Sequence, residues 1–269
     1  MTTKSIRTSF ELQISHSQVR IWVGSIALLT LLFVVSFHTN ANAQTKSPTS
    51  SSTTQVIESG KFRIYELKQI QGEESYEIRR EPGGLVVKAR MDLPFWGEEL
   101  KTLLNATLRM KDDFTTEQFE TKGIRPLEVP IDTSVSVQGR TATVRENKST
   151  KQVTVPNSFF TLAGYAPVTI GMMLFRYWLK HGLQTRLQLL PAGEAFIERR
   201  GRDTVMVGNK STSLGRYNLS GSNWGAGWGK QTLWFDSENR LVAVVNIGGD
   251  VETNFSAIRD GYDSALSFF

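Results

Sequence analysis

The alternation of hydrophobic and polar residues predicts one helix and many strands. In the stretch Ala166–Gly182, the side chains of Ile170, Leu174 and Trp178 recur every four residues, which is the spacing of one helix face. Pro167 suits the first turn, because its missing N–H has no partner at that position. The glycine that ends the stretch is typical of a helix C-terminus. We therefore expect an amphipathic helix here.

The rest of the chain after residue 56 has the pattern of strands and turns. Apolar side chains alternate with polar ones over short segments, as in strands with one buried face. The expected strands are 61–67, 75–80, 85–91, 98–110, 115–121, 134–137, 141–146, 152–155, 186–190, 194–199, 204–207, 213–218, 231–236 and 241–247. Segments rich in Gly, Pro, Asn or charge between them, including 71–74 and 201–203, predict turns. Such evenly spaced strands are typical of an antiparallel meander.

Two segments need a choice between helix and strand. Residues 98–110 contain helix-forming types, but their Leu and Ala side chains alternate with period two, which favours a strand. Residues 255–269 carry Ile258, Tyr262 and Leu266 at helical spacing and predict a short C-terminal helix. The residues therefore predict a mainly β fold, an antiparallel sheet against one apolar helix.

The N-terminal segment has the three parts of a secretory signal peptide. Lys4, Arg7 and Arg20 precede an uncharged apolar run, Ile21–Phe37, and the segment 41–43 reads Ala-Asn-Ala. A basic start, an apolar centre and a small-x-small site predict cleavage after residue 43. We expect an exported protein, periplasmic or extracellular, that loses residues 1–43. An uncleaved anchor helix is the alternative, because 17 apolar residues are near the lower limit for spanning a bilayer.

The remainder divides into a linker and one domain. Residues 44–56 are polar and Ser/Thr-rich, and we expect a disordered linker. Residues 57–269 have a length that a single β-rich domain covers. The chain has no cysteine, so disulfides do not stabilise it. Three of the 31 Lys and Arg and one of the 26 Asp and Glu precede residue 44, which leaves a net charge of +3. With no basic run, nucleic-acid binding is not expected.

The residues needed for common catalytic centres are largely missing. His181 is the single histidine after residue 43, and a histidine at a helix C-terminus is typical of a dipole-compensating or exposed residue. We expect no histidine-based metal centre, no Ser-His-Asp triad and no cofactor. The pairs Glu73-Glu74 and Asp112-Asp113 are interpreted as solvated turns, since neighbours on a strand point to opposite faces. Carboxylates from distant strands that meet in a cleft stay an open alternative.

Five side chains are candidates for lining a ligand site. The expected helix carries Met172, Phe175 and Trp178, which face either packed core or an open pocket. A Gly-rich loop carries Trp224 and Trp228. This loop lacks the Lys-Ser/Thr ending and the following helix of a phosphate loop. We interpret it as a hairpin loop whose two aromatic side chains are candidates for facing a carbohydrate or another ligand.

The order of short motifs in the second half of the chain resembles known exported domains. The motifs are Arg176-Tyr177-Trp178, Pro191-x-Gly193, Arg200-Gly201-Arg202-Asp203, Arg216-Tyr217, Trp228-Gly229-Lys230-x-x-Leu233-Trp234, Leu241–Val245 and Phe255…Arg259-x-x-Tyr262. They resemble the β-rich N-terminal module that precedes the catalytic barrel in some exported bacterial amidohydrolase-family proteins. With the opening Tyr65…Gly72-Glu73-Glu74-x-Tyr76-x-Ile78, the chain is also similar to uncharacterised periplasmic LolA-like half-barrel domains.

The resemblance covers most of Lys61–Phe269 and implies a curved antiparallel sheet, a half-barrel, wrapped around one central helix. LolA-like relatives bind acyl chains in that concavity, so the resemblance implies a hydrophobic ligand. It implies no amidohydrolase activity, because the His-rich metal motifs of the barrel are absent and no catalytic residue has a matching position.

These observations lead us to expect a non-enzymatic exported β-domain that binds a lipid-like ligand or a partner protein. One alternative is an accessory or structural module of a separately encoded amidohydrolase-type enzyme. Another is a carboxylate-based enzyme that acts on glycans. A membrane contact is expected only through the signal segment, if that segment is not cleaved.

Overall fold

The computed structural model describes residues 54–94, 101–125, 127–162, 165–222, 229–247 and 254–269. They belong to one compact unit of the chain, Ser50–Phe269. The expected signal segment and residues 44–53 of the expected linker lie outside the described residues. Residues 55 and 56, which we assigned to the linker, already belong to the first strand. Among the described residues, no helix has the length and apolar character needed to cross a membrane.

Fifteen strands and one α-helix make up most of the described structure. The strands are β1 (Gln55–Glu66), β2 (Gln69–Glu81), β3 (Gly84–Leu93), β4 (Thr102–Met110), β5 (Thr116–Arg125), β6 (Val129–Gln138), β7 (Thr141–Glu146), β8 (Ser149–Thr154), β9 (Phe159–Thr161), β10 (Leu187–Leu190), β11 (Glu194–Val207), β12 (Lys210–Ser222), β13 (Lys230–Phe235), β14 (Leu241–Ile247) and β15 (Phe255–Arg259). The helix is α1 (Val168–Lys180), and a 3-10 turn, η3 (Asp263–Ala265), follows β15.

All fifteen strands form one sheet that does not close. Its order is β8-β7-β6-β5-β4-β3-β2-β1-β15-β14-β13-β12-β11-β10-β9. Most neighbours in the sheet are neighbours in the sequence, and the pairing of β1 with β15 joins the two halves. The described pairs are antiparallel except for β9 with β10. The predicted mainly β fold and antiparallel meander are therefore confirmed, and the sheet is a curved, barrel-like one with two free edges.

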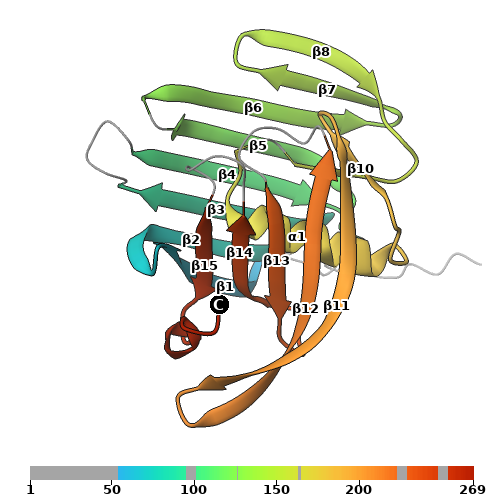
Figure 1. Ribbon diagram of the computed structural model, residues 1–269. Helices are drawn as coiled ribbons and strands as arrows, with labels where there is room; N and C mark the ends of the chain where they lie inside the picture. The colour runs from blue at the N-terminus through green and yellow to red at the C-terminus, as the bar shows by residue number, and fades with distance from the viewer. Residues whose placement is uncertain (1–53, 95–100, 126, 163–164, 223–228, 248–253) are drawn as a thin grey trace, which may run out of the picture. The chain divides into compact units, whose positions relative to one another are not determined.

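The helix lies between the two halves of the sheet (Figure 1). Ten of its thirteen residues are buried, and they share one hydrophobic core with strands from both halves. The ring of Phe175 shows the close packing. It stacks on Phe235 of β13 with 3.7 Å between ring centroids, and its centroid is 4.6 Å from that of Tyr217 on β12. The predicted helix is thus confirmed, two residues shorter at each end than expected.

A second, smaller core covers the outer face of the sheet near β1. The C-terminal segment after β15 folds over this face, and Ala265 packs with Tyr65, Trp234 and Ile258. The hydroxyl group of Tyr65 donates a hydrogen bond to Asp263, with 3.0 Å between the oxygens. Part of the sheet is therefore buried on both faces, which explains the nearly continuous apolar run of β14.

The first hairpin turns at a different place from the one we predicted. We expected the turn at 71–74, around Gly72, but the chain turns at Leu67 and Lys68, and Gly72 lies within β2. A Cβ atom on Gly72 would come within 2.1 Å of the backbone oxygen of Asp92. The glycine is therefore needed for the close approach of β3, and it is not a turn signal.

Two other predictions were wrong for a similar reason, because pairing across the sheet overrides local signals. Residues 201–203, where we expected a turn, follow a bulge at Arg200 and lie within the continuous strand β11, which pairs with β12 on both sides of the bulge. The expected helix over 255–269 begins instead with a strand, β15, held between β1 and β14. The strand prediction for 98–110 is confirmed over Thr102–Met110, and residues 98–100 lie outside the described residues.

We predict that Phe175→Ala lowers the free energy of unfolding by about 3–5 kcal/mol, the usual range for removing a buried aromatic side chain. The measurement is denaturant unfolding of the purified protein. Phe268, whose exposed fraction is 47%, gives the matched control, and Phe268→Ala should cost less than about 1 kcal/mol. Equal losses in the two variants would contradict the central role of the helix in the core.

Candidate functional site

The helix residues proposed to line a ligand site are part of the packed core. Met172 and Phe175 have no accessible surface, and Trp178 has an exposed fraction of 6%. A side chain that lines a cavity large enough for water keeps some surface accessible to a water-sized probe, so the first two do not line such a cavity. Trp178 contacts Phe175 and donates its indole N–H to the backbone oxygen of Gln184. Trp224 and Trp228 lie outside the described residues.

A buried carboxylate from the sheet anchors the start of the helix. Glu74 of β2 is fully buried, and its carboxylate oxygens accept the backbone N–H groups of Val168 (2.5 Å) and Thr169 (2.8 Å), and also the hydroxyl group of Thr169. The N-cap residue, Pro167, provides no side-chain acceptor. Glu74, which belongs to a strand, therefore caps the N-terminus of the helix.

We missed Glu74 because we interpreted Glu73-Glu74 as a solvated turn. A signal was present in the alternation of the strand, since Glu74, Tyr76 and Ile78 share one face of β2 and all three are buried. Glu73 points to the opposite face, where its carboxylate lies 2.9 Å from the ammonium group of Lys61. The expectation that the two neighbours point to opposite faces is confirmed, but only Glu73 is solvated.

A second polar cluster ties the helix to the seam between the two halves. The carboxylate of Glu58 on β1 lies 2.7 Å from a guanidinium nitrogen of Arg176 on α1, accepts the Tyr76 hydroxyl group at 2.7 Å, and lies 3.4 Å from Arg259 on β15. Burial raises the pKa of Glu58, but Arg176, Tyr76 and Arg259 lower it more, so the net pKa is below its ordinary value. Glu58 stays ionised and serves as a structural anion.

Neither His181 nor the acidic pairs form a reactive centre among the described residues. His181 is the C-cap of α1, its ring stacks on Tyr177, and its Nε2 atom lies 2.8 Å from the backbone oxygen of Asp113. Asp112 pairs with Arg80, and the Asp113 carboxylate accepts the backbone N–H of Thr115 in a turn. Within the described ranges, no group of three or more His, Cys, Asp or Glu side chains is placed to hold a metal ion.

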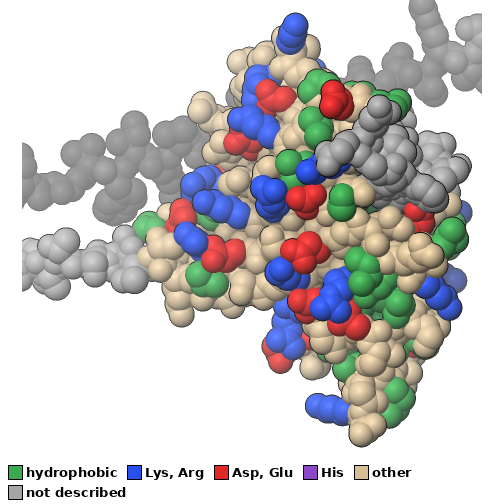
Figure 2. Space-filling model, turned by 90° about the vertical axis from the view of Figure 1, so that its left-hand side faces the viewer, with side chains coloured by type: hydrophobic (Ala, Val, Ile, Leu, Met, Phe, Trp, Pro, Cys, Tyr) green, Lys and Arg blue, Asp and Glu red, His purple; other side chains and the backbone are tan. Residues whose placement is uncertain are grey.

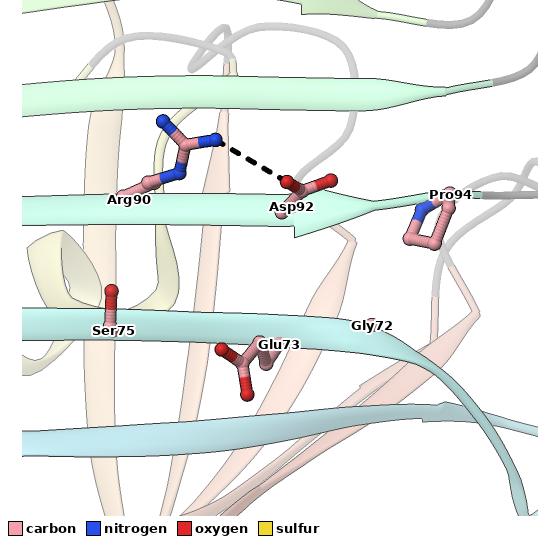
Figure 3. Close-up of a pocket in the computed structure, with 6 residues that line it drawn as sticks. All are labelled: Gly72, Glu73, Ser75, Arg90, Asp92 and Pro94. Atoms are coloured by element: carbon pink, nitrogen blue, oxygen red, sulfur yellow. Dashed lines mark hydrogen bonds and ion pairs between the residues drawn. The ribbon is translucent and has the colours of Figure 1, made fainter. Parts of the chain in front are cut away.

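The outer face of β2 and β3 carries a shallow polar hollow of about 330 Å³. Figure 3 shows that Glu73 and Asp92, which are paired across the two strands, turn apart. Asp92 faces Arg90 at 3.4 Å, while Glu73 reaches toward β1, where it meets Lys61. Each carboxylate is thus paired with its own cation. The arrangement is a solvated ionic surface and lacks the converging pair that glycoside hydrolysis requires.

Exposed apolar side chains concentrate at one end of the sheet. Nine large hydrophobic side chains are exposed in the described part of the chain, and four of them lie where β1, β5 and β14 end and β2 begins. These four, with their exposed fractions, are Leu67 (90%), Ile70 (62%), Leu127 (71%) and Ile247 (68%). Strands β1 and β14 both run antiparallel to β15, so they finish at the same end. We call these four residues the apolar end.

The backbone holds two residues of the apolar end in an unfavourable conformation. Leu67 and Lys68 form a two-residue hairpin turn with φ values of 48° and 65°, where Asn-Gly is the preferred pair. Leu127 has a φ of 63°. Leucine in the left-handed region costs about 1–2 kcal/mol, because its Cβ approaches a carbonyl oxygen. These leucines therefore stabilise neither the turns nor the core.

The surface around the apolar end carries charges of both signs. Figure 2 views the side of the molecule on which the β1–β2 turn of Figure 1 lies, and Lys and Arg side chains are interspersed there with Asp and Glu. Hydrophobic side chains form small groups between them. Charges of both signs are therefore mixed with apolar side chains on this side.

Comparisons with known proteins assign the chain neither a family nor a function. No family model matches the chain, and no curated protein matches it. One solved structure that the chain is similar to is the crystal structure of a β-barrel-like protein of DUF1849, a domain of unknown function, from Brucella abortus. The two share 10% identity with a TM-score of 0.48 over 75% of this chain and 93% of that chain.

We predict a pH dependence of stability that comes from Glu74. Burial raises its pKa from an ordinary value of 4.5 to about 7, although the hydrogen bonds from Thr169 and Val168 lower it. Because the folded state then holds the proton more tightly than the unfolded chain, this group's stabilising effect is complete below about pH 4.5 and is lost as the pH rises through 7. The loss amounts to at most about 3 kcal/mol.

The measurement is the free energy of unfolding of the wild type and of Glu74→Gln between pH 4.5 and 7.5. The difference between the two proteins should shift against the wild type as the pH rises. Glu73→Gln removes the exposed neighbouring carboxylate and should keep the wild-type profile. Parallel profiles for the wild type and Glu74→Gln would show that Glu74 does not titrate in this range.

Proposed function

We propose that this chain is an exported, non-enzymatic β-domain that binds a partner protein through its apolar end. The observation that carries the proposal is the exposure of Leu67 on a strained hairpin turn. Strained residues persist where the surrounding structure enforces them, and they cluster at functional sites. Exposed apolar side chains that contribute nothing to the core are typical of surfaces buried by a partner.

We also propose that the chain is related to LolA-like half-barrels but binds a protein instead of the acyl chains that those relatives bind. In such relatives the concavity holds acyl chains, whereas the corresponding space here holds α1. A lipid-like ligand in that space would have to displace side chains such as Phe175, together with the anchors Glu74 and Glu58. We therefore favour recognition of a protein over recognition of a lipid inside the sheet.

The size and chemistry of the apolar end also suit a protein. Leu67 and Leu127 belong to turns four strands apart, which corresponds to about 19 Å at a strand spacing of about 4.8 Å. This span is typical of a standard protein interface, which buries about 800 Å² on each side. Mixed charges around apolar residues resemble the polar rim of such interfaces. If the partner were an amidohydrolase-type enzyme, the chain would be its accessory module, so the identity of the partner decides between these two roles.

Site-specific photo-cross-linking of the full chain in its own host tests the proposal. A benzophenone side chain at Ile70 should give an adduct with one defined protein. Ile57, at the opposite end of the first hairpin and with an exposed fraction of 45%, is the matched control and should not give this adduct. Equal adducts from both positions, or adducts with lipid alone, would overturn the proposal.

We further predict that the double variant Leu67→Asn, Lys68→Gly is more stable than the wild type but binds the partner less. Asn-Gly fits the two-residue turn, so the free energy of unfolding should rise by about 1–2 kcal/mol. Loss of the exposed leucine should lower the yield of the Ile70 adduct at least about fivefold, as expected for an apolar contact at the centre of an interface.

Leu183 provides the control for this variant, because it also has a positive φ (58°) and an exposed side chain but follows the C-terminus of α1, away from the apolar end. Leu183→Asn should keep the adduct. A double variant that is more stable and still cross-links at the wild-type yield would show that Leu67 is not part of the contact surface.

A further inference from the structure

A hollow of about 310 Å³ lies on the outer face of β11, β12 and β13. The residues that line it are Arg200, Arg216, Asn218, Thr232 and Trp234. None of these side chains belongs to the apolar end, and none is used in the anchors of the helix. The hollow therefore needs its own explanation.

A β-bulge lies beside the two arginines of this hollow. Arg199 is paired with Tyr217, and Gly201 is paired with Arg216, so Arg200 is an extra residue in β11. Two residues of a bulge face one residue of the partner strand, and the bulged strand bends there. Arg200 shares the outer face with Glu198, which is paired with Asn218, and lies with Gly201 opposite Arg216. The bulge shifts the alternation of the residues that follow it, which brings Asp203 to the same outer face.

Asp203 fixes the floor of the hollow. Its carboxylate accepts the indole N–H of Trp234 at 2.8 Å and lies 3.3 Å from a guanidinium nitrogen of Arg216. The Asp203 side chain has an exposed fraction of only 16%, so both contacts are shielded from water. Asn218 and Thr232 form a cross-strand pair, with the threonine hydroxyl 3.4 Å from the amide oxygen. The lining groups are thus held in place before any ligand arrives.

The guanidinium groups of the hollow keep donors for a ligand. The described residues that line it contribute two guanidinium groups and no carboxylate, while Asp203 lies against Arg216 and Glu198 against Arg200. Asp203 is already used by two partners, and a guanidinium group keeps further N–H donors when one is engaged. Arg200 lies 3.5 Å from Glu198, but both side chains are more than half exposed, and a surface pair of this kind contributes little. An anion can therefore displace that contact at low cost.

We propose that this hollow binds a sugar that carries a carboxylate, such as a uronic acid. Guanidinium groups match the planar fork of a carboxylate. The amide of Asn218 and the hydroxyl group of Thr232 are suitable partners for ring hydroxyl groups, and Trp234 adds an apolar surface beside them. A bare phosphate ion would match the guanidinium groups alone and would have no ring to lie against the apolar face of Trp234. The proposal does not depend on the partner protein proposed above.

Titration of the full chain with glucuronate, followed by calorimetry or NMR, tests this site. Glucose has a comparable ring without the carboxylate, and inorganic phosphate has the charge without the ring. Glucuronate should bind at least about tenfold more tightly than either. Arg200→Ser should weaken glucuronate binding at least about tenfold, while the unfolding midpoint stays that of the wild type.

Arg80→Ser is the matched control, because the exposed fraction of its side chain is 52% against 53% for Arg200 and it lies on β2. It should bind glucuronate like the wild type. Three results would overturn the proposal: no saturable binding of glucuronate up to about 10 mM, phosphate binding as tight as glucuronate binding, or equal weakening in Arg80→Ser and Arg200→Ser.

Discussion

The contact between Glu74 and the first turn of α1 fixes the position of the helix, and much of the fold depends on it. The first N–H groups of a helix have no partners within the helix, and here they lie in a core where Val168 and Thr169 are buried. Leaving them unpaired would cost about 1–3 kcal/mol each. A carboxyl group from β2 satisfies both. The helix can therefore begin inside the sheet, far from water.

Once the helix is held there, its side chains fill the space between the two halves of the sheet. Phe175 fills the space toward β13, and the Glu58 cluster joins the helix to β1, β2 and β15. The inner face then contributes stability and leaves little room for a ligand. The surfaces that we propose for recognition therefore lie on the outer face and at the turns. The strained leucines fit this division, because residues that lower stability persist where the rest of the structure is stable enough to tolerate them.

The sequence predicted the elements better than their connections. The helix and most strands were recognisable because amphipathic periodicity reflects one buried face, and that face exists in the folded protein. The turn at Leu67 and Lys68 was not recognisable, since neither residue is typical of a left-handed conformation. Gly72 misled the prediction, because glycine marks close backbone approach as well as turns. The segment 255–269 has apolar residues at helical spacing, and only the pairing of β15 with two strands decides the structure of its first part.

The candidate sites were less predictable, because each depends on residues that only the sheet brings together. Arg200 and Arg216 lie side by side at a bulge, and Asp203 shares their face because the bulge shifts the alternation of β11. Leu67 and Ile247 share an end of the sheet because β1 and β14 flank β15 in the same direction. Strand direction and register thus determine the chemistry of the outer surface, whereas local patterns determine only which face is buried. A sheet whose inner face is packed against its own helix can consequently change its outer residues without changing its core.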